Sequence, residues 1–257
     1  MYIFMTNDDG FDAPGIIALA LELSKTNRVT VIAPETGVSS CSSALSLRKP
    51  MHMRKQNSYG NHVEVFSLTG TTGDCCKLAL EYWMKEDMPD LIVSGINNGF
   101  NTGSDCLYSG TVAGALEGVF AGIPSVAVSV ENTGDKEYLQ RAAVFSSDAV
   151  YKYFIEMEYK GILNINIPKL EPREITWRNT KVAPLGLQLY SNVIAGHGEN
   201  GSDMEFIMSG QPLGGEEPET DVYWSRRGLI TVTPLQWNQT DEKNLVGIKE
   251  ITATFVD

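Results

Sequence analysis

The chain has 257 residues, of which 42% are hydrophobic and 20% are charged, a composition typical of a folded globular protein and not of a disordered one. Asp and Glu total 32 against 20 Lys and Arg, which gives a formal net charge of −12. This acidity argues against a nucleic-acid polymer or an anionic membrane surface as a partner. A small anionic substrate is still compatible with it, because a bound metal ion can reverse the local charge.

The first residues lack the basic region and the long apolar stretch of a signal peptide. No window approaches the ~18 apolar residues of a membrane span. The four cysteines form no CxxC pair, and their spacing to the three histidines matches no zinc site. We therefore expect a reducing, cytoplasmic location without a membrane partner.

The first ~130 residues alternate between short β-branched runs and segments of helical period, which predicts an α/β fold with a parallel sheet and right-handed crossovers. Residues 44–70 alternate apolar and polar side chains around a turn at 59–61, as in a hairpin or strand pair. The expected strands are 2–5, 28–33, 91–93 and 125–130, and the expected helices are 15–24, 74–85, 109–121 and 142–155. The Gly- and Asn-rich segment after residue 93 is expected to be irregular.

Residues 170–257 show strand alternation and acidic loops with little helical period. We therefore expect a core at 1–169 followed by a β-rich extension at 170–257 that contributes to oligomerisation. Within the extension, residues 196–201 match GxGxxG formally. A strand is expected directly after them instead of a helix, so a hairpin turn is the better interpretation than a dinucleotide-binding loop.

Asp8 and Asp9 place two adjacent carboxylates at the carboxyl end of the first expected strand, where ligands bind in open α/β sheets. Two acids in one place are costly unless a positive charge lies between them. The pattern alone is equally typical of a turn, since Asp-Gly is a common turn signal. Ser39 and Asn97 follow two other expected strands. Together the four residues form an all-oxygen set that suits Mg²⁺, Mn²⁺ or Ca²⁺ better than zinc.

Ser109, Gly110 and Thr111 begin an expected helix. The simplest role of such a segment is a helix N-cap, but a helix N-terminus with free N–H groups also binds phosphate well. Asn101 can donate to the same phosphate oxygens, although an Asx turn is its simpler role. Beside a divalent cation, these residues favour phosphate chemistry.

Other hydrolase signatures are missing from the sequence. There is no nucleophile elbow, P-loop or Cys-x5-Arg loop, and the three histidines lie in expected edge or turn segments. A haloacid-dehalogenase-type phosphatase is disfavoured because the two acids are adjacent, whereas that class needs DxD spacing.

Six stretches form a larger pattern that spans nearly the whole chain. They are TNDDGFDAPGI (6–16), VTVIAPETGVSSCSSALSL (29–47), GTTGDC (70–75), PDLIVSGINNGFNTGSDCLYSGTVAGALEG (89–118), NINIP (164–168) and TD…ITVTPL (220–235). Taken together, they resemble the SurE family of metal-dependent 5′/3′-nucleotidases. The resemblance implies a Rossmann-like three-layer α/β/α core and a C-terminal β extension that is exchanged between subunits in homodimers or homotetramers.

The resemblance also implies a role for each matched position. Asp8 and Asp9 match the acidic metal ligands. Both are also our candidate catalytic residues, since either carboxylate can transfer a proton or attack phosphorus. Ser39 and Asn97 match the hydroxyl and amide ligands of one Mg²⁺ or Mn²⁺ ion. The positions expected around the phosphate of a nucleoside monophosphate are Asn101, Ser109, Gly110 and Thr111. The alternative from another class is a non-catalytic nucleotide-binding protein that retains the metal pocket.

Two segments depart from the family's pattern. The usual Gln or Arg followed by Ser-Gly is Val38-Ser39-Ser40 here, which leaves Ser40 as a second candidate hydroxyl. The usual Gly-Thr-Pro is Gly70-Thr71-Thr72 here, and loss of the proline is expected to loosen a turn near the site.

Overall fold

The computed structural model describes residues 1–60, 62–131, 134–197, 205–214 and 217–253. Its centre is a sheet with the strand order β3-β4-β2-β1-β5-β6-β7-β11-β8. The strands are β1 (Tyr2–Thr6), β2 (Arg28–Pro34), β3 (Met53–Lys55), β4 (Val63–Leu68), β5 (Leu91–Asn98), β6 (Ser125–Val130), β7 (Ile162–Ile167), β8 (Thr180–Val182) and β11 (Ile230–Leu235). Six neighbouring strands of this sheet are parallel, namely β4, β2, β1, β5, β6 and β7. Strand β3 pairs antiparallel with β4, and β11 pairs antiparallel with β7.

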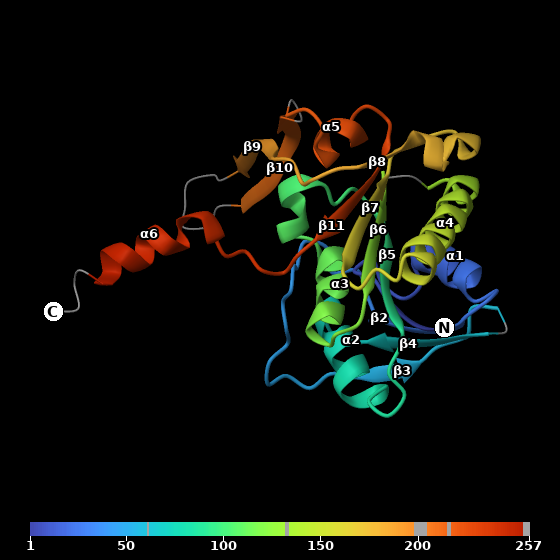
Figure 1. Ribbon diagram of the computed structural model, residues 1–257. Coiled ribbons are helices and arrows are strands. Elements are labelled where there is room, and N and C mark those ends of the chain that lie inside the picture. Colours follow the sequence, from blue (N-terminus) through green and yellow to red (C-terminus); the bar gives the residue numbers. More distant parts are fainter. Residues whose placement is uncertain (61, 132–133, 198–204, 215–216, 254–257) are drawn as a thin grey trace.

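Helices cover both faces of this sheet, as Figure 1 shows. They are α1 (Pro14–Leu23), α2 (Thr72–Leu78), α3 (Gly110–Phe120), α4 (Lys136–Val150), α5 (Asp221–Ser225) and α6 (Glu242–Ala253). Short helical turns are η1 (Ala79–Trp83), η2 (Gly103–Leu107), η3 (Tyr151–Glu156), η4 (Pro172–Glu174) and η5 (Trp177–Asn179). The expected α/β class with three layers is confirmed.

Side chains of β1 divide between the two layers because successive residues of a strand point to opposite faces. Ile3 and Met5 belong to the apolar cluster that includes α1 and α4, whereas Phe4 belongs to the cluster that includes α2. All three are fully buried. The sheet is thus buried on both sides, as parallel sheets generally are.

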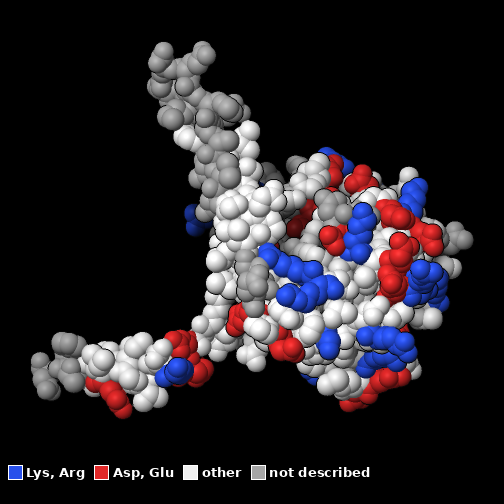
Figure 2. Space-filling view, turned by 90° about the horizontal axis from the view of Figure 1, so that it is seen from above, with Lys and Arg blue, Asp and Glu red and all other residues white. Residues whose placement is uncertain are grey.

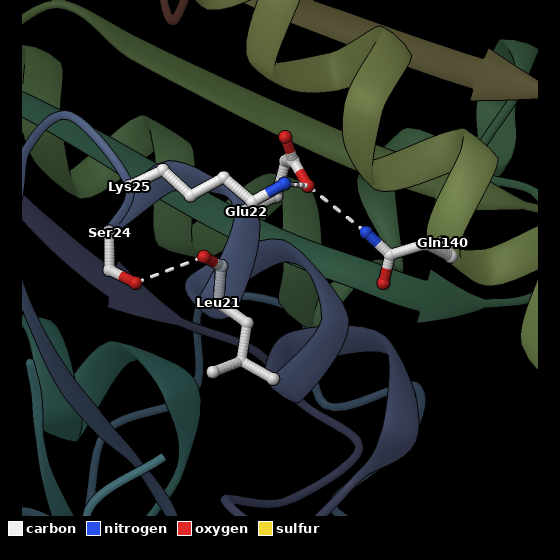
Figure 3. Close-up of polar contacts among 5 residues, drawn as sticks. All are labelled: Leu21, Glu22, Ser24, Lys25 and Gln140. Carbon is white, nitrogen blue, oxygen red and sulfur yellow. Dashed lines mark hydrogen bonds and ion pairs between the residues drawn. The ribbon is translucent and has the colours of Figure 1, made fainter. Parts of the chain in front are cut away.

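Polar side chains join α1 and α4 at the solvent-facing edge of their contact (Figure 3). Glu22 of α1 accepts a hydrogen bond from Gln140 of α4 at 3.0 Å and pairs with Lys25 at 2.6 Å. Exposed pairs of this kind contribute little to stability, so the apolar side chains beneath them hold the two helices together.

Two expected elements differ from those observed. The strand expected at 91–93 continues to Asn98, through a register shift against β6 between Gly95 and Asn97. Gly95 has a φ of +127°, and a Cβ there would lie 2.2 Å from Val128 O, so glycine is what lets this strand continue. Helix α4 begins at Lys136, earlier than expected, because Asp135 caps its N-terminus.

The segment after residue 169 returns to the core. Strands β8 and β11 extend the central sheet, while β9 (Gln188–His197) and β10 (Glu205–Gly214) form a separate antiparallel hairpin. The expected turn at 196–201 lies mostly outside the described residues, between these two strands. Helix α6 was not expected, and it extends away from the body (Figure 1). The boundary at 170 stays a prediction. Among the described helices, none is long and apolar enough to cross a membrane.

Candidate active site

The turn after β1 is braced by the side chain of Asn7. Its amide donates to Gly10 O at 2.9 Å and accepts from the Gly10 N–H at 3.2 Å. The neighbouring segment is tied to the same turn, because the Val38 N–H donates to Asp8 O at 2.8 Å. The backbone of Asp8 and Asp9 is therefore fixed at the carboxyl edge of the sheet, where β1 lies between β2 and β5.

Asp8 lies against the first turn of α3. It is only 5% exposed, and its Oδ1 accepts a hydrogen bond from the Thr111 hydroxyl at 2.5 Å. A Cβ on Gly110 would lie 2.8 Å from Asp8 Cβ, so only glycine lets the helix come this close. Burial raises the pKa of Asp8, the charge of Asp9 adds to the rise, and hydrogen bonds from Thr111 and backbone N–H groups oppose it.

Asp9 is less buried and faces β5. Its Oδ2 accepts a hydrogen bond from the Asn98 N–H at 3.0 Å. Burial also raises the pKa of Asp9, and this hydrogen bond only partly offsets the effect. The two adjacent carboxylates are thus anchored separately, one by α3 and the other by the backbone of β5.

Among the residues that the structure describes, no basic side chain forms an ion pair with these two acids. Two partly desolvated carboxylates without a cationic partner are unfavourable, and a divalent cation is the group that would relieve the cost. A carboxylate offers about four lone-pair directions, so the hydrogen bonds already made leave acceptor capacity. The residues present therefore fit a cation bound by oxygen ligands.

Asn97 and Ser39 complete the expected donor set from two sides. The Asn97 amide nitrogen donates to Gly99 O at 2.8 Å, which leaves the amide oxygen as the end for a cation. Ser39 is exposed and directly follows Val38, whose N–H bonds to Asp8. Ser40, the second candidate hydroxyl, is also exposed and has a φ of +58°. The ligand roles of these residues stay predictions.

Ser109 caps helix α3, because its hydroxyl accepts a hydrogen bond from the Val112 N–H at 3.0 Å. The simple structural role expected for this residue is therefore filled. Thr111 gives its hydroxyl proton to Asp8. What this end of α3 could offer a phosphate is chiefly the positive end of the helix dipole, because the Val112 N–H already bonds to Ser109 and the Gly110 N–H to Asp8.

Asn101 occupies a different environment from the other expected phosphate ligands. Its side-chain amide is buried and donates to Ser129 Oγ of β6 at 2.7 Å. Its backbone N–H donates to Asn166 Oδ1 at 2.8 Å, and its carbonyl accepts from the amide of Asn164 at 2.7 Å. These contacts make Asn101 an anchor of the loop after β5, and its expected phosphate role stays a prediction.

Several residues that hold the site were not singled out from the sequence. Asn164 and Asn166 of β7 stand out only as amides in an otherwise apolar strand. Thr72 replaces the expected proline, and its hydroxyl donates to Asn7 O at 3.0 Å. The hydroxyl adds a tether beside Asp8 that proline lacks, and the expected loosening of this turn stays a prediction.

The chain is similar to known proteins of one family. The family model described as "Survival protein SurE" matches residues 3–192. A protein of Clostridium beijerinckii named 5′-nucleotidase SurE is 35% identical, over 98% of this chain and 99% of its own length. A Moorella thermoacetica protein of the same name is 37% identical, over 94% of this chain and 92% of its own. The crystal structure of the SurE protein from Aquifex aeolicus is similar with a TM-score of 0.81 and 32% identity, covering 98% of this chain and all of that one. The chain described here belongs to the SurE family.

Proposed function

We propose that this protein is a divalent-metal-dependent 5′-nucleotidase, which hydrolyses nucleoside 5′-monophosphates, and also 3′-monophosphates, to nucleoside and phosphate. The observation that carries the proposal is the pair of adjacent carboxylates beside the N-terminus of α3, the buried Asp8 and the half-buried Asp9, which form no ion pair with a described basic residue. The names of the relatives support the reaction class.

The roles follow from the contacts. Asp8, Asp9, Asn97 and Ser39 would hold one Mg²⁺ or Mn²⁺ ion. Such an ion supplies positive charge that polarises a phosphoryl oxygen and makes a nearby water more acidic. The positive end of the α3 dipole would attract the non-bridging phosphate oxygens and stabilise the charge that grows on them in the transition state. Thr111 holds the Asp8 carboxylate in place.

The proposal is tested by measuring phosphate release from a panel of 5′- and 3′-nucleoside monophosphates in EDTA, Mg²⁺ or Mn²⁺. We expect turnover with either metal and none above background in EDTA. Release that is unchanged by EDTA would contradict the metal requirement. Release from no nucleotide under any condition would favour a nucleotide-binding protein without activity.

We also propose that the chain works as a homodimer or homotetramer. The support is helix α6, which has no buried residue and extends from the body (Figure 2, lower left). Its apolar side chains Ile248 and Ile251, three residues apart on one face, are each more than 60% exposed. An apolar helix face of this kind is stabilised when a second surface covers it, and we infer that a second copy of the chain provides that surface.

A further inference from the structure

A second feature lies along the same edge of the sheet. A cavity of about 490 Å³ is lined by Phe100, Thr102, Asp105, Glu131, Tyr190 and Arg226, among others. This volume lies within the range of small-molecule sites, about 300 to 1,000 Å³. The proposed active site does not use any of these six side chains.

The cavity is next to the candidate metal site. Phe100 lies two residues after Asn98, whose N–H bonds to Asp9. Glu131 directly follows β6, which is the strand beside β5 in the sheet. Neighbouring strands are about 4.8 Å apart, so the cavity and the two carboxylates are separated by only a few strand widths. One ligand of nucleotide size can reach both.

The polar groups in the wall are held in place by hydrogen bonds. The Tyr190 hydroxyl donates to Asp105 Oδ2 at 2.5 Å. The Glu131 carboxylate accepts from the Lys169 N–H at 2.7 Å. Arg226 donates to Gln188 Oε1 at 3.2 Å. Elements from the core, the β9–β10 hairpin and the α5 region thus contribute fixed groups to one cavity, as expected of a binding site.

The lining suits an uncharged, partly aromatic ligand. Asp105 and Glu131 are balanced by Lys169 and Arg226, so the wall does not favour an anion as the end of α3 does. Phe100 is half-buried and supplies an aromatic face, on which any nucleobase can stack. A fixed carboxylate after a strand, such as Glu131, is also suited to accept a hydrogen bond from a ribose hydroxyl.

We propose that this cavity binds the nucleoside part of the substrate, with its base stacked on Phe100, while the phosphate lies at Asp8, Asp9 and α3. The inference rests on the proposed nucleotidase activity. It adds the part of the site that would distinguish one nucleotide substrate from another. It assigns the choice among substrates to the loop after β5 and to Tyr190, at a distance from the reacting phosphorus.

The test compares a nucleotide with a phosphate ester that has no base. For wild type, Phe100→Ala, Phe100→Leu and Phe100→Tyr, kcat and KM are measured with a 5′-nucleoside monophosphate and with glycerol 2-phosphate in Mg²⁺. Tyr82→Ala is the matched control, because Tyr82 is an exposed aromatic residue of η1. We expect Ala and Leu to raise KM for the nucleotide about tenfold. The Phe100→Tyr variant should have the wild-type KM for the nucleotide, and hydrolysis of glycerol 2-phosphate should be unchanged in all three variants.

Equal losses on both substrates, or no loss on the nucleotide, would overturn the cavity assignment while leaving the nucleotidase proposal intact. A wild type that hydrolyses neither ester would instead remove the proposed activity. In that case calorimetry with adenosine and guanosine, which needs no turnover, decides the cavity: binding that Phe100→Ala weakens supports it. Binding that is absent or unaffected by this substitution overturns it.

Discussion

Burial of the Asp8 carboxylate has a cost that a bound cation would remove. Its pKa is raised from the ordinary value of 3.8 in the metal-free protein, so above pH 3.8 the folded state holds this proton more tightly than the unfolded chain does. Stability is therefore lost as the pH rises from 3.8 through the raised folded pKa, and the loss is constant above it. Asp9 contributes in the same direction.

Asp8→Asn should therefore stabilise the metal-free protein. The amide oxygen can still accept from Thr111, and the desolvated charge is gone. In EDTA at pH 7 we expect the variant to melt higher than wild type by a few degrees, on the order of 1 kcal/mol for a chain of this size. The difference should shrink as the pH falls toward 4. Thermal melts at several pH values measure it, and a variant less stable than wild type at every pH would contradict the argument.

Added Mg²⁺ should reverse this order. A ligand that binds only the folded state raises the melting temperature, and wild type retains the full set of ligands whereas Asp8→Asn does not. The same melts with Mg²⁺ provide this check.

At the residue scale, the sequence identifies the charged residues of the site better than the residues that hold them in position. The two acids were visible because carboxylates at a strand end are unusual. The tether from Thr72 to Asn7 and the bond from Thr111 to Asp8 were not, since each joins residues at least 65 positions apart. Spacing in the sequence carries no signal for such contacts.

Among the elements, the loop between β5 and α3 depends most on its neighbours. Its backbone is held at Asn101 by the two amides of β7. At Gly103 it is held by Asp221, whose other oxygen accepts from the Gly186 N–H at 2.8 Å. These buried contacts connect the loop before α3 to β7 and α5, so its shape depends on segments far along the chain.

Asn166→Ala should destabilise the fold and impair the site. The substitution leaves the buried Asn101 N–H without its partner, which costs about 1 to 3 kcal/mol. Asn179→Ala is the control, because its side-chain amide bonds to Glu174 O at the exposed surface. Chemical denaturation compares the two variants. A loss for Asn166→Ala no larger than that for Asn179→Ala would show that the network does not support the loop.

Element by element, the predictable part was the alternation of strands and helices. Strand β6 was placed at its observed bounds, because a β-branched run between two turn signals leaves little choice. The extension of β5 to Asn98 was missed because its glycine and two asparagines are unfavourable in strands. Pairing with β6, together with the conformation of Gly95, overrides that local preference.

For the whole molecule, acidic and basic side chains alternate over the visible face of the body, while α6 extends away from it (Figure 2). Helix α6 was not expected, since the sequence after residue 170 shows little helical period and the apolar pattern of this helix is short. The return of β8 and β11 to the central sheet was also not predicted, because pairing between distant segments is set by the fold and not by the local pattern.

Charge placed on α6 tests the proposed assembly. Ile248→Asp should shift the protein to a smaller species in light scattering coupled to size exclusion, because a carboxylate is costly in an apolar interface. Lys249→Asp, which changes charge at a neighbouring polar position, is the control. An Ile248→Asp variant with the mass of wild type would count against α6 as a contact between copies.

The cation held by Asp8 and Asp9 is the central claim, and a metal titration of activity tests it most directly. Phosphate release from a 5′-nucleoside monophosphate is measured against Mg²⁺ concentration for wild type, Asp8→Asn and Asp12→Asn. Asp12 is an exposed acid of the same segment, so its variant makes the same charge change outside the site. We predict saturable activation for wild type and Asp12→Asn, and a loss of about a hundredfold or more for Asp8→Asn. Full Mg²⁺-dependent turnover in Asp8→Asn would contradict the account.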